Sequence, residues 1–255
     1  MQNQKKFEDI VQIYLTSIIF DLLGNDTKNL LYCSKYITNT IVDHYIKNKQ
    51  IGLSTAKKMT SRKQQYIKYI FVDIFLNLSQ KDLNFTQFSR LTYLKFDCDF
   101  NQPLKIGVLP DTLTYLSFGD TFNQPLEMFV LPSKLTHLEF GNKFNQLLEQ
   151  NSLPPTLICL KFGKSYNKPL KKDVLPSTLT HLEFGVDFKH RVYFNNLLSL
   201  THLKFGFWYN WIARPIGPLP ISLKYLQIPE YYKFKSELPN DIEIKYTSFQ
   251  ESVFN

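Results

Sequence analysis

Three histidines recur in the same short sequence, Leu-Thr-His-Leu, and are the residues of this chain whose spacing could support chemistry. They are His137, His181 and His202, and imidazole nitrogens are common ligands of transition metals. On neighbouring segments of a repeat, His181 and His202 could share one ion with Glu183. The same place in related segments is taken by Tyr93, Tyr115, Cys159 and Tyr225. Duplication of a repeat therefore explains the histidines more simply than metal binding, and we predict no metal site.

Motifs that support catalysis are absent from the sequence. It contains no phosphate-binding G-x-x-x-x-G-K-[ST], no H-E-x-x-H, no G-x-S-x-G and no G-x-G-x-x-G. The cysteines, Cys33, Cys98 and Cys159, are widely spaced and form no C-x-x-C pair, which argues against disulfides and structural zinc. We therefore predict a protein that is not an enzyme, uses no cofactor or small-molecule substrate, and resides in a reducing compartment.

The positive charge of the chain is concentrated in one segment. The whole chain has a formal net charge of +8. Residues 44–72 account for most of it, because they carry seven Lys and Arg side chains and no acidic ones, whereas the rest of the chain is nearly neutral. Binding of a nucleic acid through the basic segment 47–68 is the weaker alternative, because such runs are usually solvated connectors. Polar residues interrupt the apolar stretch 10–23, which follows Glu8 and Asp9. We therefore predict neither a signal peptide nor a membrane span, and a cytoplasmic location.

The elements that must position these residues follow from a repeat of 22 residues. Successive copies of the repeat start at Leu91, Leu113, Leu135, Leu157, Leu179, Leu200 and Leu223. In each copy, positions 1, 4 and 6 are apolar and positions 3 and 5 vary. This alternation with a period of two is typical of a short strand buried on one face. One such unit cannot bury its apolar face alone, so the units must stack as rungs of a solenoid. Residues 67–72 have the same spacing and predict a degenerate first rung.

Three other positions of the repeat have structural interpretations. Gly at position 7, in five rungs, predicts a sharp bend with positive φ. Phe or Tyr at position 10 predicts a column of aromatic rings inside the solenoid. Asn at position 11 can bond backbone groups of its own rung and the next, and predicts a ladder of side chains buried at a turn. The ladder residues are Asn101, Asn123, Asn145, Asn167 and Asn210.

Positions 3 and 5 point away from the core and form the presumed concave face on which we expect a partner. Position 3 carries aromatic and imidazole groups and position 5 carries charges of both signs, which suits a protein ligand better than DNA. The alternating charges could also pair between rungs, so a purely structural role stays open. The predicted contact residues are Tyr93, Lys95, Tyr115, Ser117, His137, Glu139, Lys161, His181, Glu183, His202, Lys204 and Tyr225.

The short sequence Phe-Asn-x-Pro carries a resemblance to a known family. It occurs at Phe100–Pro103, at Phe122–Pro125 and, with Tyr in the first place, at Tyr166–Pro169, and it resembles the FNIP repeat. The spacing Leu-x-x-Leu-x-Phe is similar to that of leucine-rich repeats. The resemblance covers about residues 91–240 and implies a solenoid that holds a protein partner. Such proteins are known mainly from social amoebae and large amoeba-infecting viruses, so a viral chain would lie in the host cytoplasm or nucleus.

Residues 7–50 lack proline, whereas all 13 prolines of the chain lie between Pro103 and Pro239. Apolar residues at helical spacing, such as Ile10, Ile13 and Tyr14, predict amphipathic helices in this part. The order of residues 19–36 resembles an F-box, which implies docking to the adaptor of a cullin-type ubiquitin ligase. The residues implied to bind the adaptor are Ile19, Leu22, Leu23, Leu30 and Leu31. A helical cap on the solenoid, with no ubiquitin link, is the alternative.

Together these patterns predict an α+β fold class, in which a short N-terminal helical module precedes a leucine-rich-repeat-like solenoid with a parallel sheet of short strands. The predicted boundaries are 1–66 for the helical module and basic connector, 67–246 for about seven rungs of about 22 residues, and 247–255 for a C-terminal tail. The predicted function is non-enzymatic binding of a protein partner, as the substrate receptor of a ubiquitin ligase or as a scaffold without that link.

Overall fold

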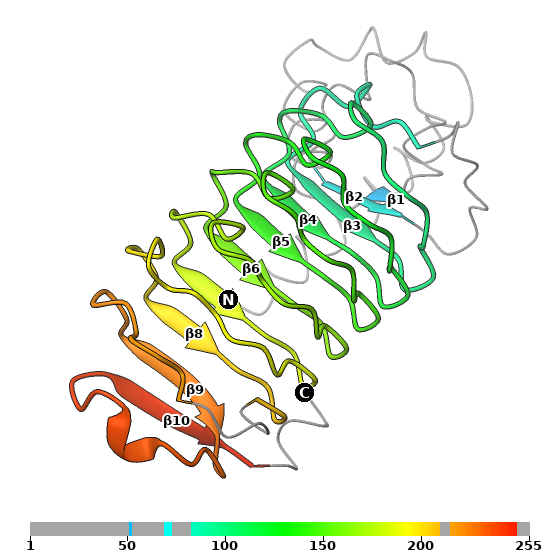
Figure 1. Cartoon of the computed structure of the whole chain (residues 1–255). Helices are drawn as coiled ribbons and strands as arrows, with labels where there is room; N and C mark the ends of the chain where they lie inside the picture. Colours follow the sequence, from blue (N-terminus) through cyan, green and yellow to red (C-terminus); the bar gives the residue numbers. More distant parts are fainter. Residues whose placement is uncertain (1–50, 53–68, 73–82, 210–214, 249–255) are drawn as a thin grey trace, which may run out of the picture. The chain divides into compact units, whose positions relative to one another are not determined.

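The computed structural model describes residues 51–52, 69–72, 83–209 and 215–248 of the chain (Figure 1). All of these residues belong to one compact unit, Gln50–Asn255. Within these ranges ten strands form a single sheet in the order of the sequence, and each strand is parallel to its neighbours. The strands are β1 (Ile51–Gly52), β2 (Tyr69–Val72), β3 (Tyr93–Phe96), β4 (Tyr115–Ser117), β5 (His137–Glu139), β6 (Cys159–Lys161), β7 (His181–Glu183), β8 (His202–Lys204), β9 (Tyr225–Pro229) and β10 (Glu243–Thr247).

Adjacent strands pair in the register that the repeat predicts. Position 4 of one rung lies beside position 4 of the next, as Leu94 lies beside Leu116 and Leu116 beside Leu138. The degenerate first rung is confirmed, because Ile70 of β2 lies beside Leu94 of β3. A slip of one residue would turn every apolar side chain of a strand to the opposite face, so burial of the leucines enforces this register.

Two columns of aromatic rings fill the interior of the solenoid. Position 6 supplies one column, in which the ring centroids of Phe118 and Phe140 are 5.6 Å apart. Position 10 supplies the other, in which the centroids of Phe122 and Phe144 are 6.0 Å apart. Within a rung the columns touch, with 3.8 Å between the centroids of Phe118 and Phe122. The predicted aromatic column is therefore confirmed, and each stacked pair adds about 0.5–1.5 kcal/mol to the burial of its rings.

Glycine at position 7 is required by the close approach of neighbouring rungs. The predicted positive φ is wrong at these positions, since the glycines with positive φ in the described chain are Gly107 and Gly217. A β-carbon added to Gly185 would lie 1.9 Å from the carbonyl oxygen of Gly163, far inside the closest approach that real β-carbons show. Only hydrogen fits at this corner, so stacking rather than backbone conformation selects glycine.

A different corner of the rung does adopt positive φ, which the sequence analysis missed. Position 17 lies in a turn closed by a hydrogen bond from the amide of position 18 to the carbonyl of position 15, as between Val108 and Lys105 at 3.3 Å. The φ angle at position 17 is between 62° and 79° at Gly107, Phe129, Asn151 and Asp173. Gly, Asn and Asp adopt this conformation readily, whereas a bulky side chain such as Phe does so at a conformational cost.

The α+β fold class is wrong for the described chain, which is a parallel β-solenoid. Its helical content is one 3₁₀ turn, η2 (Lys235–Glu237), and no α-helix lies within the described ranges. Prolines such as Pro125 and Pro132 keep the return path of a rung extended, and 22 residues leave no room for a helix. The predicted helical module falls on residues 1–50, which lie outside the described residues, and β1 forms within the segment expected to be a connector. Within the described ranges, no helical segment has the length and apolar character that crossing a bilayer requires.

Candidate functional site

The side chains at positions 3 and 5 of the rungs lie on the side of the sheet opposite to the core, and we call this surface the strand face. Burial alternates along β3 and β5–β8, as in β5, where Leu138 is buried, His137 is exposed and Glu139 is half-buried. Among the predicted contact residues, Ser117 differs in being buried. The strand face consists of Tyr93, Lys95, Tyr115, Ser117, His137, Glu139, Cys159, Lys161, His181, Glu183, His202, Lys204, Tyr225 and Gln227. The structure thus brings every predicted contact residue onto one surface.

Position 3 forms a ladder of rings that runs across the strands. Tyr93 and Tyr115 stack with their ring centroids 4.3 Å apart, and His137 continues this stack at 6.0 Å from Tyr115. His181 and His202 form a second stack, with centroids 4.2 Å apart and an interplanar angle of 8°. Because neighbouring rings cover one another's faces, a ligand meets their edges and polar atoms.

Each histidine of the ladder is oriented by the threonine that precedes it. Oγ1 of Thr201 donates to the carbonyl oxygen of Thr180 at 3.0 Å and lies 2.9 Å from Nδ1 of His202. A hydroxyl has one proton, so Nδ1 must donate to Oγ1 while Nε2 keeps its lone pair. The same two contacts occur at Thr136 with His137 and at Thr180 with His181. The imidazoles therefore present a row of hydrogen-bond acceptors.

The tyrosine pair of the ladder is linked to an acidic residue of position 5. Tyr115 hydrogen-bonds to both Glu139 and Tyr93, and burial together with these contacts raises the pKa of its phenol. Burial also raises the pKa of Tyr93. Both phenols therefore remain neutral over the physiological range and contribute hydrogen bonds and ring surface rather than charge.

Charges at position 5 pair between rungs in the second half of the strand face. Glu183 lies between two lysines, with Oε1 3.5 Å from Nζ of Lys161 and Oε2 3.5 Å from Nζ of Lys204. Glu139, which alternates with Lys161 in the sequence, hydrogen-bonds to Tyr115. Partly exposed ion pairs of this kind are worth about 0–1 kcal/mol, so a ligand can exchange partners with these charges at little cost.

The surroundings of the ladder favour the neutral forms of His181 and of the Cys159 thiol. Burial, reinforced by the charges of His202, His137 and Lys204, lowers the pKa of His181. Burial raises the pKa of the Cys159 thiol, which lies between the two ring stacks. In the part of the chain that the structure describes, no group of three or more His, Cys, Asp or Glu side chains is placed to hold a metal ion. The strand face therefore offers ring edges and hydrogen-bond acceptors beside a row of charges.

The asparagines of position 11 connect adjacent rungs at the turn that follows each strand. Oδ1 of Asn123 accepts the amide of Asn145 at 2.9 Å, and Oδ1 of Asn145 accepts the amide of Asn167 at 3.0 Å. Oδ1 of Asn101 accepts the amide of Asn123 in the same way, at 2.9 Å. These side chains are half-buried, except that of Asn101, which is exposed. They lie outside the strand face, and Asn210 lies outside the described residues.

The residues implied to bind a ubiquitin-ligase adaptor lie outside the described residues. They are Ile19, Leu22, Leu23, Leu30 and Leu31. The basic segment 47–68 also lies outside them, except for β1. The predicted roles of both segments stay predictions from sequence.

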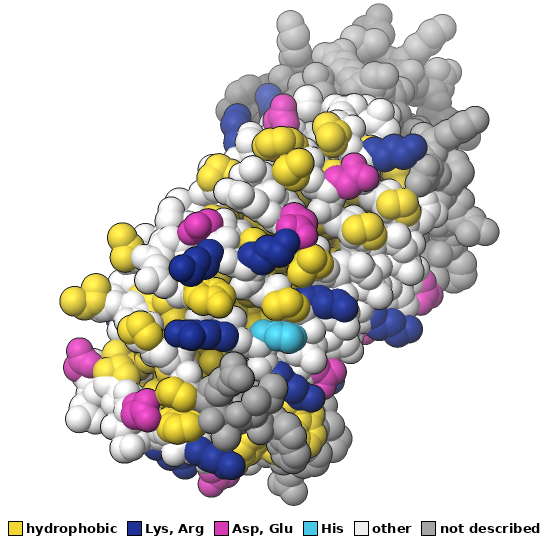
Figure 2. All heavy atoms as spheres, in the orientation of Figure 1, with side chains coloured by type: hydrophobic (Ala, Val, Ile, Leu, Met, Phe, Trp, Pro, Cys, Tyr) yellow, Lys and Arg dark blue, Asp and Glu magenta, His cyan; other side chains and the backbone are white. Residues whose placement is uncertain are grey.

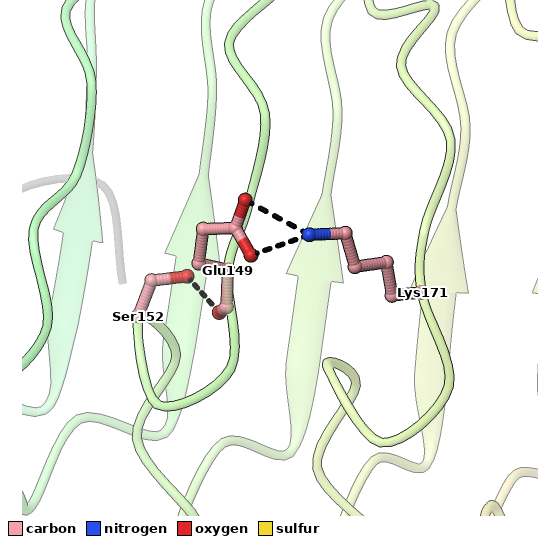
Figure 3. A network of polar contacts seen from close by, with 3 residues as sticks. All are labelled: Glu149, Ser152 and Lys171. Carbon is pink, nitrogen blue, oxygen red and sulfur yellow. Dashed lines mark hydrogen bonds and ion pairs between the residues drawn. The ribbon is translucent and has the colours of Figure 1, made fainter.

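The loop side of the solenoid carries features that the sequence analysis missed. Figure 2 shows hydrophobic side chains interspersed with charges of both signs on the face seen there. Nζ of Lys171 lies 2.9 Å from Oε2 of Glu149 on the preceding rung, and Oγ of Ser152 donates to the Glu149 carbonyl at 2.7 Å (Figure 3). A corner of two adjacent rungs exposes three apolar side chains: Ile106 by 64%, Met128 by 51% and Phe129 by 69%. The spacing of 22 residues between Glu149 and Lys171 is the signal that could have identified the pair.

Comparisons with known proteins identify the repeat. The family model of the FNIP repeat matches residues 89–121, 100–143 and 144–187. No curated protein matches the chain significantly. Among solved structures, the chain is similar to CroV588, described as a novel circular leucine-rich-repeat protein, with a TM-score of 0.63 and 36% sequence identity. The similarity covers 74% of this chain and 29% of the other, so this chain spans less than a third of the length of that protein.

Proposed function

We propose that this chain, which carries FNIP repeats over residues 89–187, is a non-enzymatic interaction protein that binds a protein partner on its strand face. The observation that carries the proposal is the ring ladder, which lies beside the row of charges across the adjacent strands β3–β9. Repeat solenoids use extended surfaces of this kind to bind other macromolecules. The rings are held by stacking and hydrogen bonds, so a partner would order few additional side chains on binding.

The chemistry of the strand face favours a protein of mixed charge. Nε2 of His181 and Nε2 of His202 can accept hydrogen bonds from a partner's amide, hydroxyl or ammonium groups. Tyr115 and Tyr93 supply the rigid amphipathic surface that is enriched at binding hot spots. A nucleic acid is disfavoured on this surface because acidic residues such as Glu183 lie among the lysines.

Affinity purification with paired variants tests this proposal. We expect His181→Ala combined with Lys161→Glu to lose a partner that the unmodified chain captures, because the double variant removes an acceptor and reverses a charge on the strand face. Lys143→Glu is the matched control, since Lys143 is exposed outside the strand face. If the double variant retained every partner that Lys143→Glu retains, the strand face would not be the binding surface.

The proposed link to a cullin-type ubiquitin ligase is supported by the order of residues 19–36, which resembles an F-box. If the link is correct, the adaptor subunit of such a ligase should copurify with the full chain. Leu22→Ala combined with Leu30→Ala should then remove the adaptor while leaving the strand-face partner bound. Recovery of that partner without the adaptor, under conditions in which an established F-box protein retains it, would identify a scaffold without a ligase function.

A further inference from the structure

The last strand of the described solenoid lies at an edge of the sheet. β10, drawn in red in Figure 1, ends the strand order and pairs within the described chain with β9 alone. At five residues it is as long as any strand of the sheet. An edge of this length presents unpaired backbone groups to any strand that can align with it.

The direction of the free backbone groups follows from the pairing with β9. The amide of Glu243 donates to the carbonyl oxygen of Lys224 at 2.8 Å, so the backbone groups of Glu243 face β9. In a parallel strand, alternate residues bond to opposite sides, which means that Lys245 also faces β9. The amide and carbonyl groups of Ile244 and Tyr246 therefore point to the open edge.

The hydrophobic core is incompletely covered at the same edge. Ile244 and Tyr246 are in register with Leu226 and Ile228 of β9, and their side chains continue the two core positions of the rung. Leu226 and Ile228 are fully buried. By contrast, Ile244 is half-buried and 40% of Tyr246 is exposed. A further strand at this position would satisfy the backbone groups and cover these side chains together.

We propose that β10 pairs with β10 of a second copy of this chain, antiparallel and across a two-fold axis. When Ile244 lies opposite Ile244 of the second copy, Tyr246 lies opposite Ile242, the residue before the strand. The residues that face each other are then those whose amide and carbonyl groups point outward, as hydrogen-bonded antiparallel pairs require. Their side chains lie on the core side of the sheet, where they cover the exposed end of the core.

Charge selects this register over its neighbour. Glu243 and Lys245 are exposed on the opposite side of β10 from Ile244. With Ile244 on the axis, Glu243 lies opposite Lys245 of the second copy, and the symmetry forms this contact twice. A slip of two residues also satisfies the hydrogen-bond pattern, but it places Lys245 opposite Lys245 of the second copy, and like charges in that position repel. The sequence of the edge strand therefore matches itself in one antiparallel alignment.

The inference is independent of the proposed function. The two-fold axis of an antiparallel pair is perpendicular to the sheet, so both strand faces would lie on the same side of a continuous sheet. A partner that carries two binding sites would then gain avidity from the pair.

Sedimentation equilibrium of the full chain over a range of concentrations tests the proposal. The unmodified chain should form a dimer in a concentration-dependent manner. Glu243→Lys and Lys245→Glu each put like charges opposite one another twice, so each should weaken association by about tenfold or more. The double variant, which exchanges the two charges, should dimerise like the unmodified chain. An equimolar mixture of the two single variants should form a heterodimer, because one copy then carries two lysines and the other two glutamates.

Ile244→Pro provides a second variant. It removes a backbone amide that points to the open edge, and it leaves every hydrogen bond to β9 in place. Edge strands tolerate proline at positions of this kind. This variant should be monomeric and should keep the circular dichroism spectrum of the unmodified chain. A chain that stays monomeric at every concentration would overturn the proposal. Association that survives both charge reversals would also overturn it, because another surface would then form the contact.

Discussion

Gly141 lies directly on Gly119 of the preceding rung, so that a β-carbon added to Gly141 would meet the carbonyl oxygen of Gly119 at 2.0 Å. The same contact joins Gly163 to Gly141, also at 2.0 Å. The spacing of the rungs at this corner is therefore set by backbone contact, with no volume left for a side chain.

Gly141→Ala should destabilise the solenoid by more than about 3 kcal/mol, because the methyl group forces two rungs apart. Gly107→Ala is the matched control, since φ is 79° there but an added β-carbon meets nothing within 4 Å. The control should cost about 1–2 kcal/mol, from the left-handed conformation alone. Urea denaturation measures both, and equal losses would show that stacking is not what requires glycine.

Tyr166→Phe should stabilise the protein by about 1–2 kcal/mol at neutral pH. The Tyr166 ring is buried in the aromatic column, and its hydroxyl has no hydrogen-bond partner in the described chain. The reciprocal change, Phe144→Tyr on the adjacent rung, places a hydroxyl in the same column and should destabilise by a similar amount. A loss of stability in Tyr166→Phe, measured by thermal unfolding, would mean that the hydroxyl does have a partner.

The buried tyrosines should also make the protein sensitive to alkali. Burial raises the pKa of Tyr166 and of Tyr209 above the ordinary value of a phenol, and raises that of Tyr231 to about 12. The phenols of the unfolded chain lose their protons near pH 10, whereas those of the folded protein keep them to higher pH. The stability that comes from this difference is therefore fully present below about pH 10 and is lost as the pH rises through the pKa of the folded state. The free energy of unfolding should therefore fall above about pH 10, and less steeply in Tyr166→Phe. A parallel fall in both proteins would exclude Tyr166 as a cause.

Phe129→Asn should stabilise the protein by about 1 kcal/mol. Phe129 has φ of 63°, and 69% of its side chain is exposed, so it combines an unfavourable backbone conformation with little burial. Asn151 occupies the same corner one rung later with φ of 65°, which makes Asn151→Phe the matched reverse change. That variant should be destabilised by a similar amount in urea denaturation. A loss of stability in Phe129→Asn, or a gain in Asn151→Phe, would contradict the backbone argument.

Asn145→Ala should destabilise by about 1–2 kcal/mol, because the amide of Asn167 loses the side-chain oxygen that it bonds at 3.0 Å. Asn145→Asp keeps an oxygen in that place and should cost less. Hydrogen exchange of the Asn167 amide provides a local measurement, and it should quicken in the alanine variant. Unchanged exchange there would show that the ladder does not protect the turn.

Nitrogen NMR should show that the neutral imidazole of His202 is the tautomer with Nδ1 protonated and Nε2 unprotonated. This tautomer follows from the contact of Nδ1 with Oγ1 of Thr201 at 2.9 Å, since that hydroxyl already donates to a carbonyl. Thr201→Val removes the contact and should allow both tautomers. An unprotonated Nδ1 in the unmodified chain would contradict the row of acceptors on the strand face.

The period of the sequence was enough to locate β2–β9 and the strand face. The direction of a side chain on a strand alternates with every residue, so Leu138 had to be buried if His137 and Glu139 were not. The alignment of the repeats likewise placed His181 beside His202, 21 residues later, before any distance was known. The α+β class was wrong for the described chain because its helical part was predicted from residues 7–50, which lie outside the described residues, whereas the described rungs contain one 3₁₀ turn.

By itself, the sequence determined the length of the rung, the residues of its core and the surface that faces away from the core, because these depend on periods that are visible along the chain. Only the tertiary structure showed that a carbonyl oxygen on the preceding rung requires glycine at position 7. It also showed that Glu183 pairs with two lysines whereas Glu139 interacts with Tyr115. Finally, it placed Ile244 and Tyr246 on the edge strand of the described sheet. The physical reason is that the alternation of residue types along the chain gives the direction of each side chain. The distances between side chains are set only when rungs about 22 residues apart in the sequence stack on one another.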